Sequence, residues 1–282
     1  MNSNAHKEKT NCRKGRVSIL FLSITILQLG CNTKMSTYLG RNPQIDKSYN
    51  GCLGATSNII ANLVPVNTIR RWADTQEQAD MLDRFISIGS QYALARFNVN
   101  PNLSYYDDGT SPNAFAFFNG SGDGIIRIGG KLVQTEFRLW RKDFFEQCRR
   151  LGKDPYQLLR EGKAGGSYAI DAIIAHEAAH ILQAKMGVAF NSRNTELQAD
   201  FLAGWHIANY HRIFQSESKE FRIKEDGIRA FYSRGDYAFN SPQHHGTPDQ
   251  RSSAFLAGFN TGDISLENVW NKSMEYRRRL GG

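Results

Sequence analysis

Residues Ala169–Gln183 read AIDAIIAHEAAHILQ, and this stretch decides the fold. It is apolar, rich in alanine and free of proline and glycine, which is typical of a buried helix. His176 and His180 are four residues apart, so on a helix their side chains share one face. Both rings can therefore direct a nitrogen at one metal ion, and Glu177 can reach a water on that ion without binding it. The stretch predicts a buried helix with two metal ligands and a general base.

A second motif follows, because residues 196–200 read ELQAD. Gly187 ends the first helix, and the polar residues 191–195 favour the start of another. Zinc in hydrolases usually keeps three protein ligands and one open position, so we expect Glu196 to be the third ligand. Asp200 lies one turn further on and is expected to accept a hydrogen bond from a ligand histidine. Alternatively, both acids have only a structural role at the positive end of the helix dipole.

The histidines also have a structural interpretation, in which His176 and His180 are core residues bound to backbone carbonyls. That arrangement would bury two polar rings and an acid on one helical turn without compensation. His206 lies about 15 Å along the second helix from Glu196, too far to share its metal. We therefore expect His206 and His211 to be ordinary polar-face or half-buried residues.

HEAAH followed by ELQAD resembles the gluzincin metallopeptidases, above all the bacterial neutral zinc metallopeptidases and more distantly the HtpX-type enzymes. Residues 112–116 and 125–130 resemble the strand pair before the active-site helix of such enzymes. Residues 245–251, HGTPDQR, resemble the C-terminal His-Gly-x-x-x-Gln-Arg segment of the neutral zinc metallopeptidases. The resemblance covers roughly residues 100–260. It implies a zincin-like domain with one Zn²⁺ per chain, the ligands His176, His180 and Glu196, and the base Glu177.

Two residues of the HGTPDQR segment are candidates for a catalytic role. His245 is expected to polarise the substrate carbonyl, and Arg251 to brace Asp200 or the substrate. The alternative is a loop histidine and a surface arginine in an ion pair of little energetic value. Thr247, Pro248 and Gln250 predict a capped helix start with a capping box.

The N-terminus has the pattern of a secretory signal. A basic start precedes the apolar run 17–29, whose 13 residues are short for a membrane span of about 20. Leu29-Gly30-Cys31 resembles a bacterial lipoprotein processing site, which predicts a signal peptide over 1–31 with cleavage before a lipidated Cys31. An ordinary secreted protein and an uncleaved anchor are the alternatives. A flexible tether over 32–66 and a metallopeptidase domain over 67–282 would follow.

The charge of the chain bears on its binding partners, and its cysteines bear on a disulfide. The chain has a formal net charge of +8, which falls to +4 without the five Lys/Arg and one acid of the signal segment. No basic stripe with interleaved aromatic residues occurs, so a nucleic acid partner is not expected. Cys52 and Cys148 could form a disulfide in an oxidising envelope, and burial of Cys148 on its helix is the alternative.

The predicted class is α+β, mostly helical, with a small antiparallel sheet. Residues 114–118 and 125–128 are expected to pair as a hairpin, whose edge would either bind substrate backbone or be purely structural. Residues 103–106 are a further expected strand. The expected helices are 70–97, with a break at Gly89 as an option, 136–151, 167–186, 195–214, 218–233, 248–259 and 266–280.

These patterns together favour a zinc metalloendopeptidase, lipid-anchored in the bacterial cell envelope and acting on protein or peptide substrates. The main alternative is an inactive zincin-like lipoprotein that serves in binding or envelope assembly, with zinc closed off by a fourth ligand such as His245. A weaker alternative is zinc-dependent hydrolysis of a cell-wall peptide or amide.

Overall fold

The computed structural model describes residues 63–64, 73–110, 112–118, 124–161, 167–188, 192–213, 223–235, 237 and 245–281. The signal segment, Cys31, Cys52 and most of the expected tether lie outside these ranges, so targeting, lipidation and the disulfide stay predictions. Cys148 is buried. None of the described helices has the length and apolar character needed to cross a lipid bilayer.

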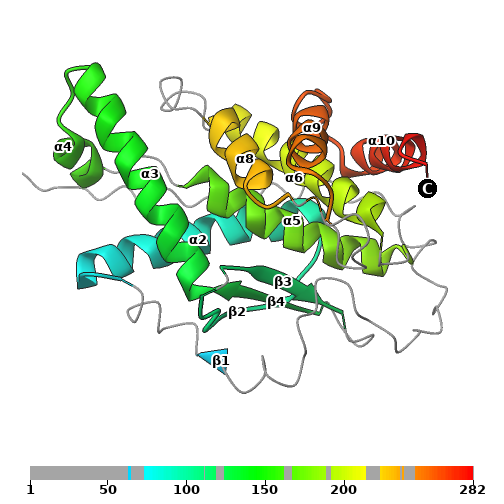
Figure 1. Ribbon diagram of the computed structural model, residues 1–282, viewed down its shortest axis with the longest axis horizontal. Helices are drawn as coiled ribbons and strands as arrows, with labels where there is room; N and C mark the ends of the chain where they lie inside the picture. Colours follow the sequence, from blue (N-terminus) through cyan, green and yellow to red (C-terminus); the bar gives the residue numbers. More distant parts are fainter. Residues whose placement is uncertain are drawn as a thin grey trace, which may run out of the picture. The chain divides into compact units, whose positions relative to one another are not determined.

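Helices predominate in the described part of the chain (Figure 1). The helices are α2 (Gln76–Phe97), α3 (Gly130–Arg150), α4 (Pro155–Arg160), α5 (Tyr168–Lys185), α6 (Arg193–Ile213), α8 (Ile223–Tyr232), α9 (Pro248–Phe259) and α10 (Leu266–Arg279). The strands are β1 (Leu63–Val64), β2 (Asn102–Tyr106), β3 (Ala114–Phe117) and β4 (Ile125–Gly129). The class is therefore α+β, as predicted. Two residues of the expected tether, those of β1, pair with β2.

The strands form one mixed sheet in the order β1-β2-β4-β3. The predicted hairpin is present, because β3 runs antiparallel to β4 with Ala116 opposite Ile126. The prediction of a purely antiparallel sheet was wrong, because β2 runs parallel to β4. The chain passes through β3 at the edge before it returns as β4 between β2 and β3. Ile126 and Ile128 of β4 are almost completely buried, which suits a central strand.

Parallel pairing of β2 and β4 also explains where α3 begins. In the β2–β4 register Tyr106 is opposite Gly129, so the residues after β2 lie beside the first turn of α3. Asp108 accepts hydrogen bonds from the backbone N–H groups of Lys131 (2.7 Å) and Leu132 (2.9 Å). An acid distant in sequence thus caps α3, which begins six residues before the expected position at Glu136.

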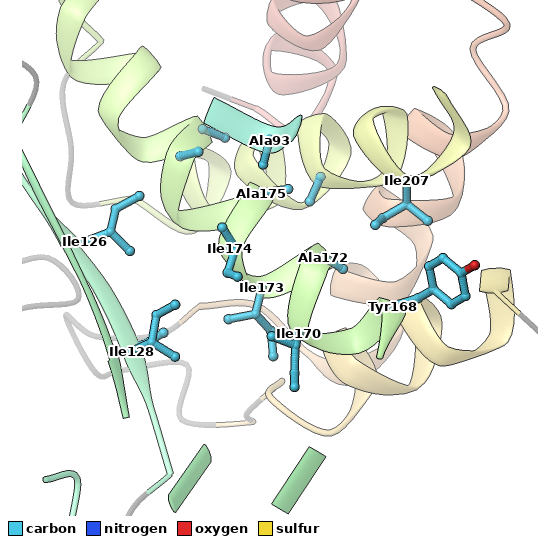
Figure 2. Close-up of a cluster of buried hydrophobic side chains, with 14 of the residues drawn as sticks. Ala93, Ile126, Ile128, Tyr168, Ile170, Ala172, Ile173, Ile174, Ala175 and Ile207 are labelled. Carbon is cyan, nitrogen blue, oxygen red and sulfur yellow. The ribbon is translucent and has the colours of Figure 1, made fainter. Parts of the chain in front are cut away.

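Helix α5 lies in the core, as its sequence predicts. All of its residues from Tyr168 to Ala184 are buried. It packs against β3 and β4 on one side and against α2, α6 and α8 on others. Figure 2 shows Ile126 and Ile128 of β4 facing the α5 residues Ile173 and Ile174. Because apolar residues occur all round this helix, it requires such cover.

Helices α6 and α9 approach each other backbone to backbone. A Cβ atom at Gly204 would collide with the carbonyl oxygen of Phe255, and one at Gly258 with the carbonyl oxygen of Phe201. Glycine is therefore needed at both positions. Because Asp200 lies one turn before Gly204, and Arg251 one turn before Phe255, this close packing brings an acid and a base together.

The other element boundaries agree with the sequence to different degrees. Helix α9 has the predicted bounds, and Thr247 and Gln250 form the predicted capping box. Helix α2 is continuous through Gly89 and begins at Gln76 rather than at residue 70, because the Thr75 side chain accepts a hydrogen bond from Gln78 N and caps it. The described part of helix α8 is Ile223–Tyr232, and its expected start at residue 218 lies outside the described residues. The short helix α4 was not expected.

Candidate metal centre

Two ligand atoms from α5 and one from α6 converge. His176 Nε2 and His180 Nε2 are 3.0 Å apart. The Glu196 carboxylate lies 3.3 Å from His176 Nε2 and 3.4 Å from His180 Nε2. Candidate ligand atoms of the three residues all lie within 4.8 Å of one another, and no other such group occurs among the described residues. The structure thus brings the two histidines of α5 together with Glu196, the acid that was expected as the third ligand.

The donor set fits a divalent metal ion. Two imidazole nitrogens and a carboxylate are common ligands of divalent transition metals. The three side chains are only 6–12 % exposed, so water can satisfy few of their polar atoms. Burial opposes ionisation of Glu196, but His180 and His176 hold its pKa well below the usual range, so the carboxylate is charged. A cation between the three groups would satisfy all of them at once.

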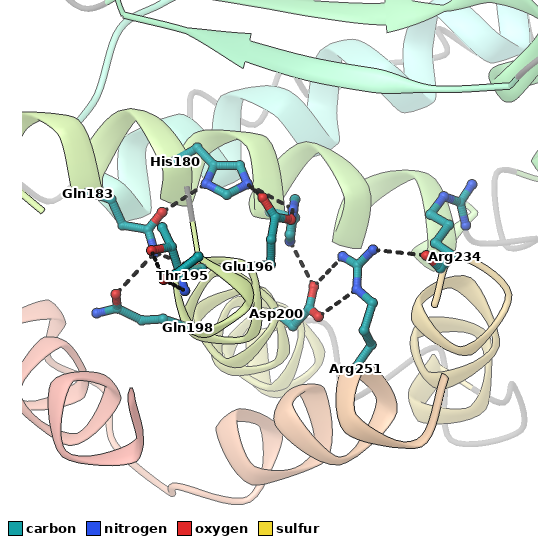
Figure 3. Close-up of polar contacts among 10 residues, drawn as sticks. His180, Gln183, Thr195, Glu196, Gln198, Asp200, Arg234 and Arg251 are labelled. Atoms are coloured by element: carbon teal, nitrogen blue, oxygen red, sulfur yellow. Dashed lines mark hydrogen bonds and ion pairs between the residues drawn. The ribbon is translucent and has the colours of Figure 1, made fainter. Parts of the chain in front are cut away.

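Asp200 and Arg251 support the first histidine. His176 Nδ1 lies 2.8 Å from Asp200 Oδ1. Arg251 donates two hydrogen bonds to the Asp200 carboxylate, from Nε (2.8 Å) and from Nη2 (2.7 Å), as Figure 3 shows. Burial opposes the charge of Asp200, but Arg251 and His176 lower the pKa of Asp200 below its usual value. Although burial alone would lower the pKa of His176, Asp200 and Glu196 raise it to about 9.

This support continues away from the metal centre. Arg251 also donates to the backbone carbonyl of Arg234 (3.4 Å), and its guanidinium lies 5.4 Å from the ring centre of Phe231. The Arg234 side chain donates to Glu136 of α3 (2.8 Å), which is buried. Residues from α3, α8 and α9 therefore fix the position of Asp200, and through it the ring of His176.

Glu177 lies next to the first ligand but is not part of the group of three. Its side chain is buried, and Oε2 has no hydrogen-bond partner in the described ranges. Burial raises the pKa of Glu177, while the two histidines oppose the shift. Burial, and then the charges of Asp108 and Glu177, raise the pKa of Tyr106 on β2, whose ring packs 5.2 Å from that of Phe115 on β3. A buried, ionisable carboxylate thus follows the first ligand directly on α5.

Gln183 is a residue of the site to which sequence reasoning assigned no role. Its Oε1 lies 2.8 Å from Nδ1 of His180, so each ligand histidine has a polar partner at its other ring nitrogen. The available signal was local. Gln183 is a polar residue three positions after His180 in an apolar helix, and side chains at this spacing meet on one face.

Of the remaining histidines, His206 and His245 are not members of the group of three. His245 is partly exposed. The next residue, Gly246, has a φ of 107° and packs against the Leu197 side chain, so this segment lies beside the first turns of α6. His206, on α6, is buried rather than half-buried, because its ring packs against Phe97 of α2. The side chain of His211 lies outside the described residues.

Comparisons with protein-family models, curated proteins and solved structures gave no match. What the arrangement can do chemically therefore follows from its own residues. His176, His180 and Glu196 can hold a metal ion, and a neighbouring carboxylate such as Glu177 can take up and release a proton.

Proposed function

We propose that this chain is a zinc metalloendopeptidase with a zincin-like domain. The observation that carries the proposal is the convergence of His176, His180 and Glu196 with the buried, adjacent carboxylate of Glu177. A metal site with a purely structural role needs its ligands but has no use for a buried acid with an unpartnered oxygen beside them.

Zinc is the metal that this donor set favours. Two histidines and one glutamate are the ligand set of several zinc hydrolases, which keep a further position open. Such an ion supplies Lewis acidity, which lowers the pKa of bound water towards about 7. In this proposal His176, His180 and Glu196 hold the ion. Asp200 orients the ring of His176, and Gln183 that of His180.

Glu177 is the general base in this mechanism. Its carboxylate accepts a proton from the water whose oxygen attacks the scissile carbonyl carbon, and then passes that proton to the amide nitrogen as the C–N bond breaks. His245 polarises the same carbonyl from the segment beside α6. Arg251 acts through Asp200, because two hydrogen bonds commit its guanidinium to that carboxylate.

The sheet supplies a place for the substrate backbone. β3 is one of the two outer strands of the described sheet, and it packs against α5. A peptide that adds to this edge as a further strand uses main-chain hydrogen bonds, which do not depend on its sequence. The substrates are therefore extended peptide segments of varied sequence. With lipidation at Cys31, the enzyme would act at the surface of the bacterial cell envelope.

Metal analysis and a peptide-library digest test the proposal on the purified protein. We expect one zinc per chain and peptide cleavage for the wild type. Glu177→Ala should retain zinc and lose cleavage, whereas His176→Ala should lose both. Glu225→Ala removes an exposed acid of α8 and serves as the matched control, with both properties unchanged.

The outcomes separate the competing functions. Full activity of Glu177→Ala would exclude the assignment of the base. Zinc held by four protein ligands, without cleavage of any peptide, would indicate a binding or assembly protein. Cleavage of peptidoglycan fragments but not of proteins would instead indicate a cell-wall hydrolase.

A further inference from the structure

A continuous chain of buried hydrogen bonds leads from the second ligand histidine to α10. Gln183 Nε2 donates to the carbonyl oxygen of Thr195 (2.9 Å) and to Oε1 of Gln198 (3.1 Å). Gln198 Nε2 donates to Oγ of Ser273 (3.0 Å), and Ser273 Oγ donates to the carbonyl oxygen of Trp270 (2.7 Å). Gln183, Gln198 and Ser273 are completely buried, so solvent cannot replace these bonds. Figure 3 shows the part of the chain from His180 to Gln198.

The direction of every bond in this chain is fixed by the acceptors at its ends. The carbonyl oxygens of Thr195 and Trp270 can only accept. Ser273 spends its single hydrogen on Trp270 and therefore accepts from Gln198. Gln183 faces an acceptor with each of its two N–H hydrogens. Its Oε1 must then face His180, so His180 Nδ1 is the donor of the 2.8 Å bond.

We propose that Gln183 is a positioning residue, held by Gln198 and Ser273, that keeps the hydrogen of the neutral His180 ring on Nδ1. This inference rests on the metal site of the proposed function. With the hydrogen on Nδ1, the Nε2 lone pair points to Glu196 and His176, where the metal ion would be held. Outer partners that fix the tautomer of a ligand histidine are worth about 10- to 100-fold in metal affinity.

The two ligand histidines are thus supported by different chemistry. His176 faces the charged pair of Asp200 and Arg251, whereas His180 faces a neutral amide. If residue 183 were a carboxylate, as Asp200 is beside His176, it would add a negative charge to a site that already buries Glu177, Glu196 and Asp200. The amide directs the ring of His180 without adding that charge.

Two readouts test the proposal, and one of them does not involve a metal. The first is the ¹⁵N chemical shifts of both His180 ring nitrogens in the metal-free protein, which report which nitrogen carries the hydrogen. We expect a protonated Nδ1 in the wild type and a mixture of tautomers in Gln183→Met, which keeps the side-chain size but has no amide. The second is zinc affinity by competition with a chelator, which should fall about 10- to 100-fold in Gln183→Met.

Further variants separate positioning from a general loss of packing. Gln183→Glu retains an acceptor for His180 and should restore the Nδ1–H tautomer, but its second oxygen faces two acceptors, Thr195 O and Gln198 Oε1, so the free energy of unfolding should fall. Ser273→Ala leaves both glutamines in place and should lower zinc affinity by less than Gln183→Met. Gln157→Met makes the same replacement at an exposed position of α4 and should change neither readout.

The outcomes are decisive in each case. An unchanged His180 tautomer in Gln183→Met would overturn the proposal, as would an unchanged zinc affinity in a protein that binds zinc. If Gln183→Met does not fold, an unchanged affinity in Ser273→Ala would overturn it. If the wild type binds no zinc, the proposed function fails, but a shift of the tautomer in Gln183→Met would still support the positioning role of Gln183.

Discussion

Asp200 is completely buried between the ring of His176 and the guanidinium of Arg251. A buried charge is tolerated only when partners replace the water that it has lost. Arg251 provides this replacement in bidentate geometry, which is the strongest form of a carboxylate contact. Removal of Arg251 alone should therefore lower the free energy of unfolding by more than removal of the charges of both Arg251 and Asp200.

The first prediction concerns this pair. Arg251→Ala leaves the Asp200 carboxylate buried and without its bidentate guanidinium partner, so the free energy of unfolding of the metal-free protein should fall by about 3–5 kcal/mol. The measurement is equilibrium unfolding in urea. Arg251→Ala combined with Asp200→Asn should cost less than the sum of the two single changes. Simple additivity would mean that the two side chains act independently.

His206 is the subject of the second prediction. It is almost completely buried, and neither ring nitrogen has a hydrogen-bond partner within the described residues. Burial, and then the charge of Arg96, lower its pKa from 6.5 to about 3. His206 is therefore protonated near pH 6.5 in the unfolded chain but only near pH 3 in the folded chain. The free energy of unfolding is at its full value above pH 6.5 and falls as the pH decreases towards 3.

His206→Leu should remove this sensitivity to acid. The variant has no buried nitrogen to satisfy, so its free energy of unfolding at neutral pH should rise by about 1 kcal/mol. Between about pH 6.5 and pH 3 its stability should fall less steeply than that of the wild type. Urea unfolding at several pH values measures both effects. An identical slope in the two proteins would show that His206 does not determine acid stability.

Residues close in sequence were the easiest to identify. His176, Glu177 and His180 follow from helical spacing alone, and the helix that carries them was predicted within one residue at each end. Glu196 and Asp200 also share one helix, but the choice between a ligand and a structural role needed the fold. The contact between Gln198 and Ser273 joins residues far apart in sequence, and no local pattern indicates it.

At the level of elements, α3 illustrates a boundary that depends on tertiary structure. Its N-cap residue is Gly129, which has no side chain that could bind the free N–H groups. Asp108 supplies the missing acceptor from the loop after β2, and it also accepts from Asn113 N (3.2 Å). One carboxylate therefore stabilises both the helix start and the loop that leads to β3.

The third prediction tests this cap. Asp108→Ala should lower the free energy of unfolding by about 0.5–2 kcal/mol, as loss of an N-cap does. Hydrogen exchange at the amides of Lys131 and Leu132 should become faster. Asp107→Ala is the matched control, because the Asp107 carboxylate accepts instead from Gly109 N (3.2 Å) and should matter little. Unchanged exchange in Asp108→Ala would contradict the assignment.

Elements with local signals were predicted well, and those with remote signals were not. The bounds of α9 were correct because Thr247, Pro248 and Gln250 form its start within four residues. The start of α3 was wrong because its cap comes from Asp108. The prediction of an antiparallel sheet was wrong for β2 and β4, because their sequences show two strands but not their relative direction.

At the level of the whole molecule, the candidate ligands join two helices that also form the centre of the core. Helix α6 packs against α5, α8, α9 and α10. A metal ion held by His176, His180 and Glu196 would bind the folded chain, while these ligands are dispersed in the unfolded chain. Its binding free energy would therefore add to the stability of the fold.

The fourth prediction follows from this linkage. Zinc at about 100 times its dissociation constant should raise the free energy of unfolding by about 2.7 kcal/mol, and a chelator should reverse the increase. Because the pKa of His176 is raised to about 9, the ion must displace a proton at neutral pH, so zinc affinity should increase between about pH 7 and pH 9. Calorimetry measures the zinc affinity, and thermal unfolding measures the gain in stability.

His180→Ala is the control for this prediction. Because the variant lacks one ligand, zinc should leave its free energy of unfolding unchanged.

The side chains that orient the two ligand histidines include residues of α9 and α10, near the end of the chain. This position has a consequence during synthesis on the ribosome. His176, His180 and Glu196 emerge well before Arg251 and Ser273, which complete the two hydrogen-bonded networks behind them. A nascent chain that ends between these groups has its ligands but not the side chains that orient them. The fully oriented metal centre would thus form late, after translation has passed Arg251 and Ser273.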